Sequence, residues 1–405
     1  MFLQNGRIAP ARRTVELSHQ RRAFFHADLV YPVLIAVERQ QAAIAMHAHA
    51  IQRIEDEVGR EFGKRRGGIV HAVILQSLTR NPLMTYTYGD NRLLSGASLK
   101  PENLADAVVL FGEVLADVFP DQSVLGGAPF NVARHLQAFD LTPVLISRTG
   151  SDALRDALLE EMARLGMQVA GVQCDEERPT GQVQVILENG SHRFDILPDQ
   201  AYDHICAEAT QEALAAIRPR LAYFGTLAQR SPQSRLAVER FLQTCNCPVF
   251  LDINLREPWY DEATIATSLG AADIVKLNED ELAVVAGVFD LDHLSHEAQA
   301  MALQQRFGLQ QLVVTCGASG SWLLDERQKV TRAAPAGTSQ PVADTVGAGD
   351  AYAAVFILGL LSQWDAPTTL QRASDYAAAI CQVRGSAPAS TAFHQPLRVA
   401  WNIER

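Results

Sequence analysis

The sequence at 344–350 is Asp-Thr-Val-Gly-Ala-Gly-Asp, and it runs directly into AYAAVFILGLL (351–361), a stretch with the length and composition of a buried helix. A helix N-terminus leaves backbone N–H groups unpaired and carries the positive end of the helix dipole, so a glycine turn there can wrap an anion closely. Asp350 stands where a phosphate would bind, which is unfavourable for a carboxylate unless it takes a proton from an attacking hydroxyl. Taken alone, the segment is equally compatible with an ordinary helix start.

Composition indicates a soluble globular protein. The chain has 405 residues, 48% of them hydrophobic, which is enough for one large α/β domain plus additional material. No apolar run approaches the 18 or more residues that a membrane span requires, so we expect no membrane contact. The six cysteines are scattered without metal-ligand spacing, which favours reduced thiols in a cytoplasmic protein.

Charge divides the chain into two parts. Residues 1–100 hold 14 Lys and Arg against 8 Asp and Glu, whereas the remainder holds 21 against 38. This change of sign suggests two regions with different origins or partners. The acidic main body argues against nucleic acid as its ligand.

An alternation of apolar and helical segments begins at Ala107. The strand candidates are near-continuous apolar runs, as strands buried on both faces require: AVVLFG, PVLISRTG, RLAYFG, PVFLDIN, DIVKLN and QLVVTCG. Between about 168 and 197, polar and apolar residues alternate instead, which predicts a small antiparallel sheet with one wet face. The pattern predicts an α/β fold whose central, mostly parallel sheet is flanked by helices, with the small sheet closing over a ligand as a lid.

The first 104 residues show no such rhythm, and we treat them as an N-terminal extension before a domain at 105–397, with a tail at 398–405. Three explanations for the extension remain open. The start can be mispredicted, with Met84 as one alternative initiator; the region can be a genuine addition; or it can be a targeting segment. The basic, arrhythmic composition favours the first.

Four motifs occur in an order that resembles one known family. They are GGAPFNVA at 126–133, NEDE at 278–281, TCGASGSWLL at 315–324 and DTVGAGD at 344–350. Over about residues 106–395 the chain resembles the ribokinase-like (PfkB) carbohydrate kinases, and GEVLADVFP and LDINLREPWY are most similar to the fructokinase branch. The resemblance therefore implies a ribokinase-like fold and an ATP-dependent sugar kinase.

The resemblance assigns roles within the GAGD segment. Asp350 corresponds to the catalytic base, and the backbone amides from Val346 through Gly347, Ala348 and Gly349 correspond to the anion hole for the transferring phosphoryl group. Asp344 is implied to shape the loop and a nearby site for a monovalent cation such as K⁺. The resemblance also implies that Thr345 contacts the nucleotide.

Asn278 and Glu281 match the NxxE motif, which in the family organises Mg²⁺ and its waters near the phosphates. Mg²⁺ prefers to keep several waters and to take one or two oxygen ligands. Taken alone, NEDE could simply be the acidic first turn of a helix with Asn278 as its N-cap.

The nucleotide is implied to lie along Gly317 and Gly320, just after strand QLVVT. Small residues allow a purine and its phosphates to approach the backbone. A plain turn between two strands is the alternative.

Substrate-binding roles are implied for six residues. Asp117, Gly126, Gly127 and Asn131 match the positions at which the family binds substrate hydroxyls, and Arg193 and Arg256 are candidates for lid and phosphate contacts. A carboxylate and an amide supply the mixed acceptors and donors that a polyol needs. For Asp117 and Asn131 the alternative is a purely structural role, in a loop or as the N-cap of a helix. For the two arginines the alternative is a solvated position on the surface.

Other enzyme classes fit less well. The GREFGK segment at 59–64 has one spacer too few for a phosphate-binding GxxxxGK[ST] loop, and no GxGxxG follows a first strand. We expect an ATP- and Mg²⁺-dependent kinase for the 6-hydroxyl of fructose. Alternative substrates are 2-keto-3-deoxygluconate, ribose or another ketose, and a non-catalytic sugar sensor is the alternative from another class. An alternating sheet with an open edge is also compatible with a homodimer.

Overall fold

The structure is a computed structural model of the chain. It describes residues 107–119, 122–188, 191–336, 342–383, 385–388 and 391–403. The predicted N-terminal extension, residues 1–104, lies outside the described residues. All described residues fall within one compact unit, which extends from Gly96 to Arg405. Their helices include none that is both long and apolar enough to cross a membrane.

A large twisted sheet runs through the described part of the chain, with nine strands in the order β13-β12-β11-β10-β9-β8-β1-β4-β5. The strands are β1 (Ala107–Phe111), β4 (Thr142–Gly150), β5 (Val172–Asp175), β8 (Leu221–Phe224), β9 (Val249–Asp252), β10 (Ile274–Asn278), β11 (Gln311–Thr315), β12 (Ser321–Leu324) and β13 (Val330–Ala333). Every neighbouring pair from β11 to β5 is parallel, whereas β12 and β13 pair antiparallel. The predicted fold class is confirmed.

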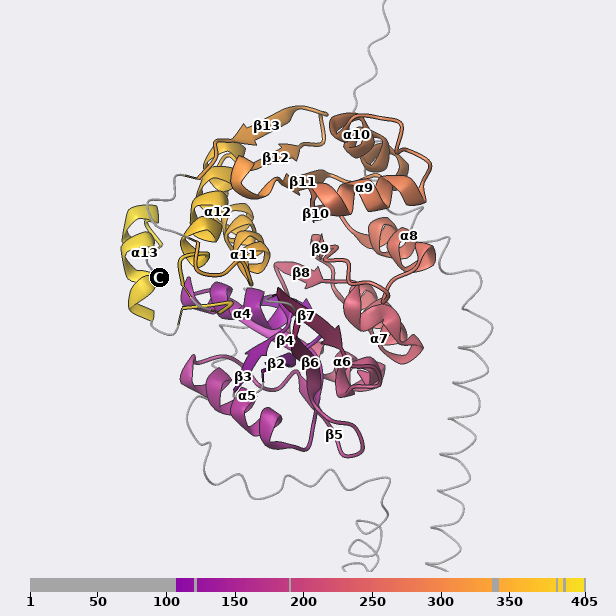
Figure 1. Ribbon diagram of the computed structural model, residues 1–405, viewed down its shortest axis with the longest axis vertical. Coiled ribbons are helices and arrows are strands. Elements are labelled where there is room, and N and C mark those ends of the chain that lie inside the picture. The colour runs from indigo at the N-terminus through magenta and orange to yellow at the C-terminus, as the bar shows by residue number, and fades with distance from the viewer. Residues whose placement is uncertain are drawn as a thin grey trace, which may run out of the picture. The chain divides into compact units, whose positions relative to one another are not determined.

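Helices cover both faces of this sheet, which is why central strands such as β1 and β8 are continuously apolar. One face packs on α4 (Ala128–Ala138), α5 (Ala153–Arg164), α11 (Ala348–Leu361), α12 (Ala366–Ile380) and α13 (Gln395–Trp401). The other packs on α6 (Ala207–Leu214), α7 (Pro232–Thr244), α8 (Glu262–Ala271), α9 (Glu279–Val288) and α10 (His296–Phe307). Figure 1 shows α11 to α13 on one side of the sheet and α7 to α10 on the other. Residues 351–359 of α11 are all buried, as their composition predicts.

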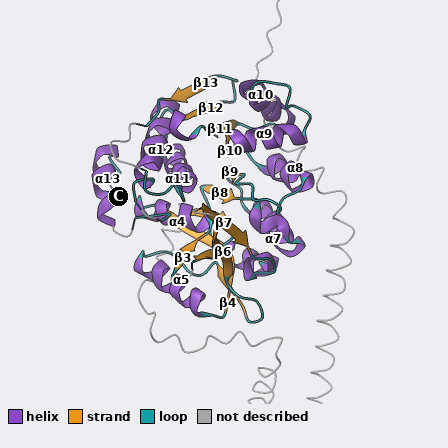
Figure 2. Cartoon of the chain, in the orientation of Figure 1, coloured by secondary structure: helices purple, strands orange, loops and turns teal. Residues whose placement is uncertain are grey.

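A second sheet, in the order β3-β2-β6-β7, lies beside the first (Figure 2). Its strands are β2 (Leu115–Val118), β3 (Ser123–Gly126), β6 (Gly181–Glu188) and β7 (Ser191–Ile196). It differs from the predicted antiparallel sheet at 168–197 in two ways. Residues 172–175 form β5 at the edge of the large sheet, and β2 pairs with β6 in parallel. The small sheet is thus completed by β2 and β3, which immediately follow β1 in the chain.

The C-terminal segment belongs to the packed domain. The predicted boundary between domain and tail, at 397/398, falls inside α13. Trp401 near the end of this helix stacks on Phe139, with 5.4 Å between the ring centroids. Residues up to 403 therefore contribute to the core on the α11–α12 side of the sheet.

The fold determines where a site can form. In parallel sheets the carboxyl ends of the strands share one edge, and ligands bind in the crevice beyond it. Asp252 and Asn278 end β9 and β10, and Glu113 follows β1 by two residues. The starts of α4 and α11 meet near the same edge, as the contact between Asn131 and Asp350 shows.

Candidate active site

The turn before α11 has a shape that only glycine allows. Gly347, the N-cap residue, has φ of 79°, and a Cβ added there would lie 2.6 Å from the Cα of Ser386. Asp344 holds the turn from the other side, because its Oδ1 accepts the Val346 N–H at 3.0 Å and its Oδ2 accepts the Gly385 N–H at 3.4 Å. The backbone at this helix start is therefore set by the chain itself before any ligand arrives.

The backbone amides of this turn differ in whether they already donate a hydrogen bond within the protein. The Val346 N–H is donated to Asp344, and the Ala348 N–H is donated to the Thr345 carbonyl at 3.3 Å. Within the described residues, the Gly347 and Gly349 amides have no such partner, and no side chain caps α11. Of the four amides expected to form an anion hole, the two from glycine are the most available. Thr345, the residue predicted to contact the nucleotide, is exposed to solvent.

Asp350, in the first turn of α11, meets Asn131 of α4. The Asn131 Nδ2 donates to the Asp350 Oδ2 at 2.8 Å across 219 positions of sequence. Asn131 is buried, and its Oδ1 accepts the Ser386 hydroxyl at 2.9 Å. Two residues predicted for different tasks, a base and a sugar ligand, thus share one hydrogen bond.

Burial raises the pKa of Asp350 to about 6. The hydrogen bond from Asn131 opposes this rise, the nearby charge of Asp252 adds to it, and Lys276 and Arg256 oppose it. A carboxylate with a pKa near 6 is ionised at neutral pH and still basic enough to accept a proton from a hydroxyl. The environment therefore suits a general base.

A buried ion pair lies behind the GAGD turn. Lys276 of β10 contacts both carboxylate oxygens of Asp252, at 2.8 and 3.0 Å, and both side chains are buried. A Cβ on Gly349 would lie 3.5 Å from the Lys276 Nζ. Burial alone would lower the pKa of Lys276, but Asp252 and Glu281 offset this and the net pKa is raised. A permanent positive charge therefore lies beside the turn.

Glu113 supports the start of α4. Its Oε1 accepts the Ala128 N–H at 3.3 Å, and a Cβ on Gly127, whose φ is 103°, would lie 2.6 Å from the Glu113 carbonyl oxygen. Burial raises the pKa of Glu113 to about 7, against the lowering effect of the backbone hydrogen bonds that it accepts. Glu113 thus holds the glycine turn that precedes Asn131.

The predicted sugar residues lie on and around β2 and β3. Asp117 is on β2, and a Cβ on Gly126 would lie 3.7 Å from its Oδ2. Burial raises the pKa of Asp117 to about 6, while the charge of Arg256 lowers it and that of Asp344 raises it. Arg256 also lowers the pKa of Asp350, so one arginine acts electrostatically on both carboxylates.

Arg256 and Arg193 are less well defined than the carboxylates. The Arg256 side chain is exposed, and its Nη1 donates to the Leu255 carbonyl at 3.0 Å. Arg193 lies on β7 opposite Ile186, and its side chain falls outside the described residues.

Asn278 and Glu281 form a complete capping box at the start of α9. The Asn278 Oδ1 accepts the Glu281 N–H at 2.8 Å, and the Glu281 Oε2 accepts the Asn278 N–H at 2.9 Å. The Glu281 Oε1 accepts the Leu255 N–H at 3.0 Å. Burial raises the pKa of Glu281, and the charge of Lys276 opposes this rise. Every side-chain oxygen of the motif therefore already accepts one backbone amide.

Gly317 and Gly320 form a tight turn between β11 and the antiparallel β12. Both have positive φ, 52° and 94°. A Cβ on Gly320 would lie 2.9 Å from the Ala333 carbonyl oxygen, whereas one on Gly317 would meet nothing within 4 Å. Gly320 is thus required by the hairpin itself, and Gly317 leaves open space above it.

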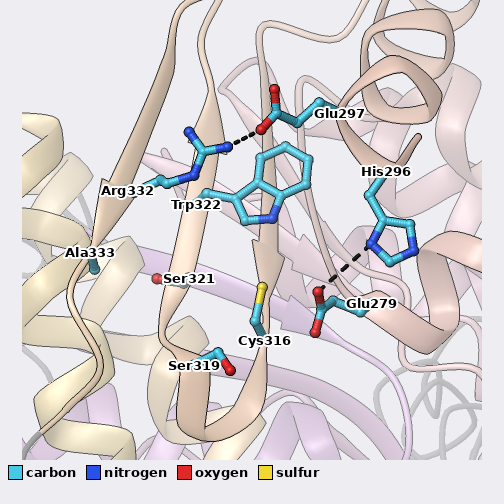
Figure 3. Close-up of a pocket in the computed structure, with 9 residues that line it drawn as sticks. All are labelled: Glu279, His296, Glu297, Cys316, Ser319, Ser321, Trp322, Arg332 and Ala333. Carbon is cyan, nitrogen blue, oxygen red and sulfur yellow. Dashed lines mark hydrogen bonds and ion pairs between the residues drawn. The ribbon is translucent and has the colours of Figure 1, made fainter.

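A pocket of about 310 Å³ opens beside this turn (Figure 3). Cys316 and Ser319 line it from the turn, and Trp322 lines it from β12. Two ion pairs lie at its rim, between Glu279 and His296 at 3.7 Å and between Glu297 and Arg332. Among the described residues that line it, none belongs to the predicted sugar site, so the pocket adjoins the predicted nucleotide turn only.

Sequence reasoning missed three charged residues at the strand ends: Glu113, Asp252 and Lys276. A signal was present for Lys276, because a lysine inside the apolar run DIVKLN must be buried and therefore paired. Asp252 had the matching signal in FLDIN. Glu113 follows a buried strand, and its role depends on how closely α4 approaches β1, which spacing alone does not give.

Comparison with known proteins gives a consistent result. The model of the pfkB family of carbohydrate kinases matches residues 102–392. A fructokinase of Escherichia coli is 27% identical over 270 residues, covering 63% of this chain and 84% of that one. Fructokinase-2 of Oryza sativa subsp. japonica is 26% identical over 278 residues, covering 64% and 80%. The crystal structure of a Xylella fastidiosa fructokinase with bound ATP superposes with a TM-score of 0.64 at 22% identity, covering 73% of this chain and 99% of that one.

Proposed function

Because this chain belongs to the pfkB family of carbohydrate kinases, we propose that it transfers the γ-phosphate of ATP to a hydroxymethyl oxygen of a sugar, and that this sugar is fructose, giving fructose 6-phosphate. The observation that carries the proposal is the 2.8 Å hydrogen bond between Asn131 and Asp350. This bond joins the amide that we propose binds the sugar to a carboxylate of raised pKa at the start of a helix. A sugar hydroxyl bound by Asn131 would lie within reach of Asp350.

In the proposed reaction Asp350 removes the proton from the attacking hydroxyl. The oxygen then attacks the γ-phosphorus in line as the bond to the ADP oxygen breaks. The Gly347 and Gly349 amides, the positive end of α11 and the buried Lys276 are arranged to stabilise the charge on the transferring phosphoryl group. Positioning and charge stabilisation together account for most catalysis in reactions of this kind.

The residues of the NxxE motif fit a Mg²⁺ held through water. Each side-chain oxygen of Asn278 and Glu281 accepts one amide and keeps a second lone pair that can accept a hydrogen bond from a water. Among the described residues, no cluster of three or more His, Cys, Asp or Glu could hold a metal directly. When bound to ATP, Mg²⁺ would neutralise phosphate charge, and the protein would orient its water shell through these two residues.

A monovalent cation such as K⁺ is the second proposed cofactor, near Asp344. The turn there is closed by hydrogen bonds from Val346 and Gly385 to Asp344 and from Ala343 to the Cys381 carbonyl at 2.8 Å. A cation that stabilises this turn would raise the rate through the adjoining amides. Replacing KCl by tetramethylammonium chloride at constant ionic strength tests this directly.

The test of the function is ADP release with ATP and Mg²⁺ across fructose, ribose, 2-keto-3-deoxygluconate, glucose and fructose phosphates. We expect the highest kcat/KM with fructose. A stronger signal with another sugar would retain the mechanism and change the substrate. If sugar and nucleotide both bind but no ADP appears, the protein is a non-catalytic sugar sensor and the proposed function is wrong.

The small sheet also supports the prediction of a homodimer. β7 is an edge strand, and Phe194 on it is 50% exposed. Unpaired strand edges with exposed apolar side chains favour pairing with a second copy. Sedimentation of the protein with and without Phe194→Asp tests the pairing, which predicts a monomer for the variant.

A further inference from the structure

A network of hydrogen bonds, buried except for its partly buried last bond, leads from the C-terminal end of the domain to Asp350. The Tyr376 hydroxyl lies 2.8 Å from the His394 Nε2 and 2.8 Å from the His135 Nδ1. The His135 Nε2 lies 3.1 Å from the Ser386 carbonyl oxygen. The Ser386 hydroxyl then donates to Asn131, which donates to Asp350.

The two ends of this network determine the direction of each hydrogen bond. A carbonyl oxygen can only accept, so the His135 Nε2 carries the proton that is directed at Ser386. Burial lowers the pKa of His135 to about 3, helped by His394 and Arg134, so its ring is neutral and its Nδ1 accepts from Tyr376. The Tyr376 oxygen in turn accepts from His394.

The same argument applies at the other end. An ionised Asp350 can only accept, so Asn131 directs its NH₂ group toward it and its carbonyl oxygen toward Ser386. The Ser386 hydroxyl must then donate. The directions of these hydrogen bonds are mutually consistent, and Ser386 joins the two halves of the network through its hydroxyl and its backbone carbonyl.

Packing holds Ser386 against both halves of the active site. It is buried, and its Cα lies 2.6 Å from the position that a Cβ on Gly347 would occupy. Ser386 therefore touches the N-cap of α11 while it bonds to Asn131 on α4. A change at Ser386 would be felt at both helix starts.

Resting on the proposed role of Asp350 as the base, we propose that Ser386 is a positioning residue, itself held by His135 and Tyr376, that keeps the Asn131 amide turned with its NH₂ toward Asp350. Without the Ser386 hydroxyl, the Asn131 Oδ1 loses its donor, and Asp350 alone is left to favour one orientation of the amide. In the flipped orientation its oxygen would face the carboxylate and repel it. The base would then be both misplaced and harder to ionise.

The charged and titratable groups that face Asp350 come from several elements: Glu113 after β1, Tyr223 on β8, Asp252 on β9, Arg256 in the following loop and Lys276 on β10. None of these contacts Ser386 through a hydrogen bond among the described residues. Because Ser386→Ala keeps the Cα and Cβ that pack against Gly347, a shift in the titration of Asp350 in this variant would arise through Asn131.

The test is the pH dependence of kcat/KM for the sugar in Ser386→Ala. We expect the acid limb to move up by roughly 0.5–1 pH unit, because loss of one hydrogen bond to a carboxylate raises its pKa by about that amount. We also expect kcat to fall about three- to tenfold, with KM for ATP unchanged. The matched control is Ser374→Ala, which removes another buried serine hydroxyl, 3.1 Å from Ser321, and should leave the limb in place.

An unchanged acid limb in folded Ser386→Ala would overturn the proposal, as would an equal shift in Ser374→Ala. If Ser386→Ala does not fold, Ser386→Cys decides, because a thiol fills the same space but is a weak donor. It should shift the limb in the same direction by a smaller amount, and no shift would overturn the proposal.

A second readout is independent of activity. Long-range ¹H–¹⁵N spectra of the wild-type protein, assigned with His135→Asn, should show His135 neutral and protonated at Nε2 from pH 5 to 8. If no sugar gives ADP, the proposed function fails while this spectrum still tests the network. An Nδ1-protonated or charged His135 would refute the network even in an active kinase.

Discussion

Two kinds of helix start in this domain differ at the N-cap, and the site residues Asn131 and Asp350 follow only one of them. α4 and α11 begin at glycines with positive φ, Gly127 and Gly347, and neither has a capping side chain at its N-cap. By contrast, α5, α8, α9 and α12 begin at Asp152, Asp261, Asn278 and Asp365, each of which accepts an amide of its own first turn. A side-chain cap satisfies an amide of its own first turn, whereas at α11 the Gly347 and Gly349 amides are left available to a ligand.

The contrast is sharpest between α9 and α11. Both have acidic residues in the first turn, and both lie at the carboxyl edge of the large sheet. At α9, Glu281 accepts two backbone amides and closes the helix start. At α11, Asp350 accepts from a side chain of another helix and leaves the amides before it available. An acidic first-turn residue thus closes the start of one helix and leaves amides available at the start of the other.

Among the substitutions that distinguish α11 from the capped helices, Asp350→Asn should have the largest effect on turnover. Loss of the general base should lower turnover by about two to four powers of ten. Because Asn has nearly the same shape, we expect the melting temperature to change little. Steady-state ADP release and thermal melting measure both.

The control for this substitution is Asp365→Asn at the start of α12. Asn is as good an N-cap as Asp, so this variant should retain wild-type turnover. If Asp350→Asn keeps activity close to that of Asp365→Asn, Asp350 is only a first-turn residue and the proposed mechanism is wrong.

Gly347→Ala should have the next largest effect, because the added methyl group does not fit the turn before α11. An alanine would carry the strain of φ 79° and a contact of 2.6 Å with Ser386, so we expect a loss of about 1–3 kcal/mol in the free energy of unfolding. ADP release per folded molecule should also fall, because the strained turn displaces the Gly347 and Gly349 amides. Denaturant unfolding and ADP release measure the two.

Gly270→Ala is the matched change at a capped helix, α8. A Cβ there meets nothing within 4 Å, so this variant should gain roughly 0.5–1 kcal/mol and keep its activity. Equal stability of the two variants would show that the α11 turn tolerates a side chain.

Asn278→Ala tests whether the start of α9 only stabilises its helix. Loss of this cap should cost about 1 kcal/mol of stability, within the range of 0.5–2 kcal/mol typical for such changes. If Asn278 also orients the water shell of Mg²⁺, the Mg²⁺ concentration for half-maximal activity should rise. Asp261→Ala at α8 should lose similar stability with no change in this concentration. Identical Mg²⁺ titrations for the two variants would leave Asn278 as a cap only.

Much of this arrangement could be predicted from the sequence, because it depends on local chemistry. Continuous apolar runs such as AVVLF gave the parallel strands, and the glycines before an apolar helix gave the turn at Gly347. The family resemblance supplied the expectation that Asn131 and Asp350 lie in one site, although 219 positions separate them.

What escaped prediction depends on register and on long-range packing. Strand β5 alternates like the segments after it, yet it pairs with β4, because alternation does not say which sheet a strand joins. Trp401 joins the core because Phe139, Trp364 and Tyr376, which are distant in sequence, lie next to it. Ser386 lies in a segment without periodicity, and its proposed role depends on a hydrogen bond to Asn131, 255 positions away, which no local pattern contains.

The smallest predicted effect concerns pH, and it separates the two carboxylates of the site. The pKa values of Asp350 and Asp117 are both raised to about 6. The base works only when ionised, so kcat/KM should fall about tenfold per unit as pH drops below 6 and level off above it. In Asp117→Asn the limb should stay within about half a unit of its wild-type position, since Asp350 remains. Loss of the limb in this variant would assign the titration to Asp117, and the catalytic base would then have to be sought on the strand side of the site rather than at the glycine start of α11.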